Sequence, residues 1–323
     1  MLKPWTVGVT AKSFLANKAL CEALIDQCPG WTVRFADADL VDDRQYLQDF
    51  LSDVSHWVVG REAVDATNIA KAKQLRIVSK YGVGLDNIDF DACARAGISV
   101  RWRPGVNAQA VAELTIGLMI SLSRNIHLGA SRLQQGHWWK NGGIAFSGKT
   151  VGIIGVGAIG SRVARLARGF SCQVLLCDIL LKDRLAEEIG ASQLDLDELV
   201  SQSDFVSLHV PLTVETRTMM DRQRLARMQQ HAFLVNTSRG EVIDQEALKL
   251  ALRKRYIAGA ALDVFADEPL KDKDLYSLEN FIGTAHIAGN SREAVWAMGQ
   301  AAIDGVKEKG YCQLSNEPYI KGY

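Results

Sequence analysis

The sequence has no excess of either charge and no long apolar run, and both absences narrow its function. Its 323 residues carry 37 basic and 37 acidic side chains, for a formal net charge of zero. Proteins that bind nucleic acids usually carry a basic excess, so we expect no nucleic-acid partner. The longest apolar stretch, residues 111–122, is short and contains Glu113, and the N-terminus lacks the apolar core of a signal peptide. We therefore expect a cytoplasmic protein with no membrane segment.

Paired cysteines are absent as well. The six cysteines show no CxxC spacing and stand at Cys21, Cys28, Cys93, Cys172, Cys177 and Cys312. Zinc sites and disulfide frameworks are built from closely or regularly spaced cysteines, so neither is indicated here. We expect reduced, mostly buried thiols and no metal.

Short β-rich runs alternate with helical patterns along most of the chain. The first series includes WTVGVT, WTVRFA, HWVVG, RIVSKYG and ISVRW, and a second, after residue 150, includes QVLLCD, FVSLHV, FLVNTS and IAGAALDV. Between them, Pro104 and Gly105 precede one long apolar-periodic helix over residues 107–128. Repeated strand and helix units form parallel sheets with helices on both faces. The pattern predicts an α/β protein with two doubly wound parallel-sheet domains, ending in a helix over residues 291–310.

A glycine-rich turn follows the first strand of the second series. The segment VGIIGVGAIG, residues 151–160, places Gly155, Gly157 and Gly160 between an apolar strand and a helical pattern. Such a G-x-G-x-x-G turn lets bare backbone approach a pyrophosphate, and the helix N-terminus offers unpaired N–H groups to the phosphates. In this context the motif predicts a dinucleotide-binding Rossmann domain.

An acidic residue at the end of the next strand favours NAD over NADP. Asp178 stands 18 residues after Gly160. A carboxylate at this place can accept hydrogen bonds from the ribose hydroxyls of adenosine, and it repels a 2′-phosphate. Lys182 and Arg184 follow closely, so NADP stays open as a second cofactor.

Three later segments carry groups suited to catalysis: NTSRG with Arg239, DVFADEP with Asp263 and Glu268, and TAHIAGN with His286. With GVGLDNID and VAEL upstream and LHVPLT between, they resemble the D-isomer-specific 2-hydroxyacid dehydrogenases, the family that includes D-3-phosphoglycerate dehydrogenase. The resemblance covers nearly the whole chain. It implies an NAD-dependent oxidoreductase that interconverts a small D-2-hydroxy acid and its 2-oxo acid.

The reduction needs a hydride, a proton and a cation for the substrate carboxylate. The resemblance implies that His286 is the acid/base, that Glu268 is its partner and that Arg239 holds the substrate. The residue types fit, because imidazole exchanges a proton near neutral pH and a guanidinium holds a carboxylate through two hydrogen bonds. Taken singly, each residue could equally be structural. Together, in the family's order, they predict the catalytic group.

Further contacts follow from the resemblance. Val83 and Gly84 match the loop whose backbone N–H groups meet the substrate carboxylate. Arg61 and Arg103 could line the mouth of the site and favour a substrate with a second anionic group, or they could be surface charges. His209, in LHVP, is interpreted as structural. Besides the glycines and Asp178, the residues expected to contact the cofactor are Ala158, Ile159, Pro211, Thr216, Thr237 and Asp263, the last at the nicotinamide carboxamide.

The family also implies a domain order and an assembly. Residues 1–103, with 291–323 returning to them, are expected to form a substrate-binding domain around an inserted NAD-binding domain of residues 104–290, with the active site in the cleft between them. The chain is expected to lack the C-terminal regulatory domain of some phosphoglycerate dehydrogenases. Residues 128–143, with adjacent Trp138 and Trp139, match an arm that packs across a twofold axis in relatives, which implies a homodimer.

Two other functions remain open from the sequence. Related transcriptional corepressors keep the same fold and the same three catalytic residues, so an NAD-sensing binding protein is the alternative. A methyltransferase that used the glycine turn for another adenosine ligand would leave Arg239, Glu268 and His286 unexplained. The positions that depart from the family pattern, and so leave the 2-oxo acid open, are Trp102, Arg103, Ala108 and Trp296.

Overall fold

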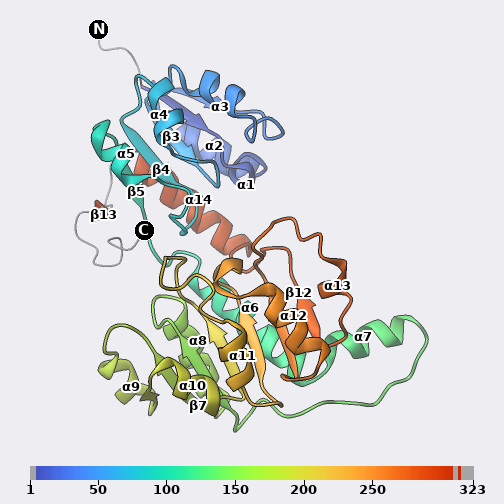
Figure 1. Cartoon of the computed structure of the whole chain (residues 1–323). Helices are drawn as coiled ribbons and strands as arrows, with labels where there is room; N and C mark the ends of the chain where they lie inside the picture. Colours follow the sequence, from blue (N-terminus) through green and yellow to red (C-terminus); the bar gives the residue numbers. More distant parts are fainter. Residues whose placement is uncertain (1–4, 308–311, 314–323) are drawn as a thin grey trace. The chain divides into compact units, whose positions relative to one another are not determined.

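The computed structural model describes residues 5–307 and 312–313. The chain divides into two compact units, one formed by residues up to Asn107 and from Asn290 onward and the other by Ala108–Gly289. Each unit is built on its own sheet (Figure 1). The two doubly wound α/β units confirm the predicted fold class.

The sheet of the first unit has the strand order β2-β1-β3-β4-β5-β13. All neighbours pair in parallel except β13, a two-residue strand that runs antiparallel to β5 at the edge and was not predicted. The chain order reverses between β1 and β3, which is the switch point of a doubly wound sheet. The strands are β1 (Thr6–Val9), β2 (Thr32–Phe35), β3 (His56–Val59), β4 (Ile77–Lys80), β5 (Ser99–Trp102) and β13 (Cys312–Gln313).

Helices cover both faces of this sheet. One face packs on the apolar sides of α3 (Arg44–Leu51), α4 (Ala66–Lys71) and α5 (Phe90–Arg95). The other packs on α1 (Lys12–Leu15), α2 (Lys18–Gln27) and α14 (Arg292–Val306), although α14 lies almost two hundred residues after β5 in the sequence. The Ser79 hydroxyl donates to the carbonyl oxygen of Ala302 at 2.7 Å, which ties β4 to α14.

The sheet of the second unit is entirely parallel, in the order β8-β7-β6-β9-β10-β11-β12. The first six of these strands along the chain have the Rossmann order, with its switch point between β6 and β9. The strands are β6 (Thr150–Ile154), β7 (Gln173–Cys177), β8 (Ser192–Gln193), β9 (Phe205–Leu208), β10 (Phe233–Asn236), β11 (Gly259–Leu262) and β12 (Phe281–Gly283).

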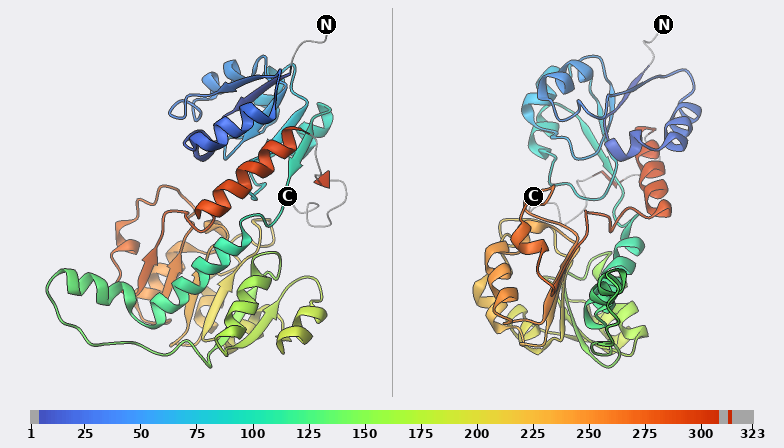
Figure 2. Two further views of the ribbon diagram at one scale, coloured as in Figure 1. Left: turned by 180° about the vertical axis from the view of Figure 1, so that it is seen from behind. Right: turned by 90° about the vertical axis from the view of Figure 1, so that its right-hand side faces the viewer.

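Two helical layers enclose this second sheet (Figure 2). One layer contains α6 (Ala108–Ser123), α8 (Gly160–Gly169) and α9 (Asp183–Ile189). The other contains α10 (Leu196–Gln202), α11 (Arg222–Arg227), α12 (Gln245–Arg253) and α13 (Lys273–Tyr276). Within the described residues, no helix is long and apolar enough to cross a membrane.

The long helix predicted over residues 107–128 is broken, and that prediction was wrong. Helix α6 ends at Ser123, and α7 (Ile126–Gln134) begins after Asn125, whose φ of 52° is left-handed. Asparagine enters this conformation at low cost, so the helix can end here. The apolar period of the sequence continues through the break and therefore did not reveal it. Helix α7 has no buried residue, and with the segment after it projects from the rest of its unit (Figure 1).

His56, at the start of β3, is buried among aromatic rings. Its ring centroid lies 5.2 Å from that of Trp5 and 4.8 Å from that of Trp31, and its Nδ1 lies 2.9 Å from the Ser55 hydroxyl. Burial, with a smaller contribution from the positive charge of Arg76, lowers the pKa of His56 to about 4. The folded protein therefore holds this imidazole neutral.

This histidine predicts a loss of stability in mild acid. Because its folded pKa lies below its ordinary value, the unfolded chain binds the proton first, so the free energy of unfolding falls as pH decreases through about 6.5 towards 4. Between pH 7.5 and 5, the protonation of this histidine in the unfolded chain should lower the free energy of unfolding by about 2 kcal/mol. Urea unfolding at both pH values should show a smaller loss for His56→Gln than for wild type, with His137→Gln as the control. Equal losses in all three proteins would contradict this role for His56.

Candidate active site

The glycine turn joins β6 to α8 by close backbone contact. Gly155 has a left-handed φ of 87°, and a methyl group added there would lie 2.7 Å from the carbonyl group of His209. A methyl group added at Gly160 would lie 2.0 Å from the carbonyl oxygen of Gly155. At Gly157 an added methyl group would meet no atom within 4 Å. Gly155 and Gly160 thus allow the close backbone contacts of the turn, whereas the space beside Gly157 is open.

This open space lies at the N-terminus of α8. The N–H groups of Ala158 and Ile159 have no hydrogen-bond partner in the described part of the chain. Unpaired N–H groups and the positive end of the helix dipole favour an anion at this place. The turn therefore fits the pyrophosphate of a dinucleotide, with Gly157, Ala158 and Ile159 as the residues that would hold it.

Asp178 connects the end of β7 to this turn. Its carboxylate accepts hydrogen bonds from the N–H of Val156 at 2.7 Å and from the N–H of Leu180 at 2.9 Å. The Lys182 ammonium lies 3.5 Å from the same carboxylate. Asp178 thus also positions the glycine turn, a role the sequence did not suggest, and Lys182 offsets part of its charge.

The loop after β9 borders the turn. His209 donates its backbone N–H to the carbonyl oxygen of Ile154, and its ring lies 2.9 Å from the Ser207 hydroxyl. Burial lowers the pKa of His209 to about 3, so the ring is neutral. Further along, the Thr216 hydroxyl donates to the carbonyl oxygen of Pro211 at 2.6 Å and closes the loop. These side chains stabilise the loop itself.

His286 and Glu268 form a direct pair. Nδ1 of His286 lies 2.9 Å from Oε2 and 3.1 Å from Oε1 of Glu268. The Glu268 carboxylate also accepts the backbone N–H of Phe265 at 3.1 Å. The carboxylate is therefore held from its own loop while it orients the imidazole ring.

Asp263 holds the loop that carries His286. Its side chain has no exposed surface, and its carboxylate accepts the Thr284 hydroxyl at 2.5 Å and the N–H groups of Ile287 and Ala288 at 2.9 and 2.8 Å. In addition, the N–H of His286 donates to the Asp263 carbonyl oxygen. The carboxylate thus holds the loop, and the contact with the nicotinamide carboxamide predicted for Asp263 stays a prediction.

The loop with Arg239 packs against the loop with Glu268. A methyl group added at Gly240 would lie 2.0 Å from the Phe265 carbonyl carbon, so the two backbones are in contact. The half-buried Arg239 guanidinium donates to the carbonyl oxygen of Ser238 at 2.8 Å. Arg239, Glu268 and His286 thus come from loops that follow β10, β11 and β12, which are neighbours in one sheet.

Thr237, just before Arg239, is turned towards the helical layer. Its hydroxyl lies 3.0 Å from that of Thr115 on α6, and its residue is 7% exposed. Its side chain therefore anchors the strand end, and the cofactor contact predicted for Thr237 stays a prediction.

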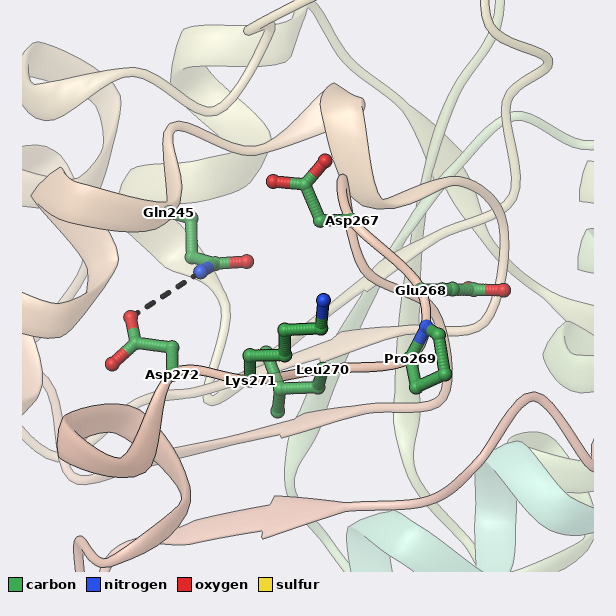
Figure 3. Close-up of a pocket in the computed structure, with 7 residues that line it drawn as sticks. All are labelled: Gln245, Asp267, Glu268, Pro269, Leu270, Lys271 and Asp272. Carbon is green, nitrogen blue, oxygen red and sulfur yellow. Dashed lines mark hydrogen bonds between the residues drawn. The ribbon is translucent and has the colours of Figure 1, made fainter.

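A cavity of about 370 Å³ lies beside the Glu268 loop. Figure 3 shows Gln245 and Asp272 joined by a hydrogen bond, with the Glu268 carboxylate directed away from both. Neither Arg239 nor His286 lines this cavity, so it is not the centre of the catalytic group. Its lining is made by Gln245, Asp267, Glu268, Pro269, Leu270, Lys271 and Asp272.

The other predicted substrate residues, besides Arg239, lie in the first unit. Val83 and Gly84 are half-buried in the loop after β4, and Arg61 is exposed in the loop after β3. Arg103, just after β5, forms an ion pair of 3.3 Å with Asp304 on α14. Among the described residues, no group of three histidine, cysteine or acidic side chains is placed to hold a metal ion.

Comparison with known proteins identifies the family. The family model for the NAD-binding domain of D-isomer specific 2-hydroxyacid dehydrogenases matches residues 116–288. A glyoxylate reductase of Thermococcus litoralis is 39% identical over 242 residues, which cover 72% of this chain and 73% of the relative. The chain belongs to the D-isomer specific 2-hydroxyacid dehydrogenase family.

Two further members of the family are similar to this chain. D-3-phosphoglycerate dehydrogenase of Methanocaldococcus jannaschii is 40% identical over 243 residues, or 74% of this chain, but the chain spans only about half of that relative, 46%. The structure of D-lactate dehydrogenase from Aquifex aeolicus, complexed with NAD and lactic acid, has a TM-score of 0.82 and 26% identity, and covers 94% of each chain.

Family membership confirms the class of reaction and the cofactor predicted from the sequence. This 2-hydroxyacid dehydrogenase is an NAD-dependent oxidoreductase that acts on the CH–OH group of a 2-hydroxy acid. The relatives are reductases and dehydrogenases, and they give no support to the alternative of an NAD-sensing corepressor.

The glycine turn predicts different defects at two of its positions. Gly157→Ala should fold normally, because the methyl group meets no protein atom, but it should raise the Kd for NADH at least tenfold by occupying space needed by the phosphates. Gly160→Ala should lower the free energy of unfolding by about 1–3 kcal/mol, because it overpacks the turn. Fluorescence titration with NADH and thermal unfolding distinguish the two defects. Wild-type affinity in Gly157→Ala would show that the cofactor does not bind over this turn.

Proposed function

We propose that this protein reduces a small 2-oxo acid to the D-2-hydroxy acid with NADH, using His286 as the acid/base, Glu268 as its partner and Arg239 to hold the substrate. The observation that supports the proposal most strongly is the pairing of His286 with Glu268 at 2.9 Å. This pair stands on loops at the carboxyl edge of the sheet, where ligands bind in doubly wound folds.

The hydrogen bonds indicate which ring nitrogen acts. An ionised carboxylate only accepts hydrogen bonds, so a Glu268 carboxylate requires a proton on Nδ1 of His286. Nε2 is then the nitrogen that delivers a proton to the carbonyl oxygen during reduction and takes it back during oxidation. NADH, when bound, supplies the hydride for the carbonyl carbon.

The substrate carboxylate needs fixed positive or donor groups. The Arg239 guanidinium can bind it through two parallel hydrogen bonds. The unpaired N–H groups of Val83 and Gly84 are the second set of donors in this proposal.

Replacement of His286 tests the acid/base role. His286→Asn should lower kcat about a hundred- to ten-thousandfold, because proton transfer loses its donor. The Kd for NADH should stay near the wild-type value, since the glycine turn and Asp178 are unchanged. Stopped-flow measurement of NADH oxidation with glyoxylate, hydroxypyruvate and pyruvate gives kcat, and fluorescence gives the Kd.

The matched control is His231→Asn, which removes a surface histidine paired with Asp204. It should turn over like wild type. Normal turnover by His286→Asn would remove His286 from the proton step, and no activity of wild type on any 2-oxo acid would refute the proposed reaction.

The size and charge of the substrate depend on the first unit. We propose that Arg61, exposed after β3, favours a second anionic group on the substrate. Arg103, which forms an ion pair with Asp304, is the second candidate. The names of two relatives, glyoxylate reductase and D-3-phosphoglycerate dehydrogenase, indicate the two extremes of substrate: a compact monoanion and a phosphorylated acid.

A selectivity measurement distinguishes these substrates. The ratio of kcat/KM for phosphohydroxypyruvate to that for glyoxylate should fall about tenfold or more in Arg61→Ala, because a charge-assisted hydrogen bond is lost. Arg103→Ala should change the ratio less. If neither variant changes it, both arginines are surface charges and the site suits a smaller acid.

We also propose a homodimer formed through the arm of residues 128–143, together with Ile126 just before it. Apolar side chains are exposed along it: Ile126, Leu133 and Trp138 are 52%, 58% and 81% exposed. The guanidinium of Arg132 lies 4.1 Å from the centre of the Trp139 ring. An exposed apolar surface of this kind is typical of an interface with a second protein surface. The predicted cytoplasmic location stays a prediction.

Light scattering tests the assembly. Wild type at micromolar concentration should have twice the 35.5 kDa mass of one chain. The double variant Leu133→Glu, Trp138→Glu should dissociate, because two charges would be buried in the interface. The substitution pair Ile25→Glu, Leu40→Glu, at exposed apolar side chains of the other unit, adds the same charge and is the control. A wild-type mass of 35.5 kDa would contradict the dimer.

A further inference from the structure

The loop of residues 81–86, after β4, carries the N–H groups of Val83 and Gly84. Both of its ends are fixed by buried polar contacts. The Lys80 ammonium, just before the loop, donates to the side-chain oxygen of Asn87, just after it, at 2.7 Å. The Asn87 amide then donates to the backbone oxygen of Glu62 at 2.6 Å, in the loop after β3. The base of the loop is thus closed, while its middle still needs a constraint.

That constraint is a hydrogen bond from a tryptophan. Nε1 of Trp102, the last residue of β5, donates to the carbonyl oxygen of Val83 at 2.9 Å. The Trp102 ring is held in place because it packs against the apolar core on the α3, α4 and α5 face of the sheet. In the part of the chain that the structure describes, the N–H groups of Val83 and Gly84 have no partner.

The geometry of the peptide group carries this constraint further. A trans peptide is planar, so its C=O and the following N–H point in opposite directions. When the indole holds the Val83 carbonyl, the N–H of Gly84 must therefore point away from the Trp102 ring. Gly84 would otherwise let this peptide plane turn over at little cost, because the rotation changes ψ of Val83 and φ of Gly84, and glycine accepts positive φ.

We propose that Trp102 is a positioning residue for the substrate carboxylate, since its indole N–H holds the Val83 carbonyl and so fixes the direction of the Gly84 N–H. This inference rests on the proposed function, in which that N–H binds the carboxylate. Trp102 acts through the backbone and does not touch the reacting atoms. Its loss should therefore weaken substrate binding and leave hydride and proton transfer largely unchanged. Trp102 is one of the positions at which the sequence departs from the family pattern.

The test removes the N–H donor and keeps the ring. Trp102 is replaced by β-(3-benzothienyl)alanine, in which sulfur takes the place of the indole N–H at nearly the same size. The KM for the best 2-oxo acid should rise about three- to tenfold, the loss expected for one neutral hydrogen bond. We expect kcat to stay within twofold and the KM for NADH and the melting temperature to stay at wild-type values. Trp102→Phe should show the same KM effect, and Trp5→Phe, which alters an exposed tryptophan of the same unit, should show none.

The outcomes separate two failures. If wild type reduces 2-oxo acids and the benzothienyl variant keeps the wild-type KM, the role of Trp102 is wrong and the proposed function stands. An equal rise in the KM values for 2-oxo acid and NADH, with a lower melting temperature, would also overturn the role of Trp102, because such a change indicates general destabilisation. If wild type reduces no 2-oxo acid, it is the proposed function that fails.

Discussion

One buried carboxylate, that of Asp263, holds the edge of the second sheet that carries the proposed catalytic residues. It accepts three hydrogen bonds from residues 284, 287 and 288, while the strand that leads to it pairs with β10 and β12. His286 lies inside this set of bonds with a left-handed φ of 53°, a conformation that costs a residue with a side chain of order 1 kcal/mol or more. The bonds to Asp263 offset that cost, and the imidazole is presented towards Glu268.

The other loops of the proposed site depend on close backbone packing. Gly240 touches the Phe265 peptide, and Gly155 touches His209, so that the loops after β6, β9, β10 and β11 pack at their bases without intervening side chains. Parallel strands end at one edge of a sheet, which brings these loops together. The polar chemistry of the site is thus carried on a frame of glycines and buried hydrogen bonds, and a side chain added to that frame would disturb several loops together.

The repeated strand and helix pattern was enough to predict two parallel sheets, and the order of the motifs was enough to predict the family. Other features have no local signal. The left-handed Asn125 breaks a helix without changing its apolar period, and the edge strands β8 and β13 have two residues each, too few for any period. The roles of Asp263 and Trp102 depend on partners about twenty residues away, which only the fold brings into contact. Neither spacing nor residue type marks them.

The stereochemistry of the product tests the central claim most directly. Membership of the D-isomer specific family implies hydride delivery to one face of the 2-oxo acid, with His286, paired with Glu268, as the proposed proton donor. A prochiral substrate such as pyruvate or hydroxypyruvate, reduced with NADH and resolved on a chiral column, should yield the D-2-hydroxy acid alone. Formation of the L isomer, or of a racemic mixture, would contradict the account.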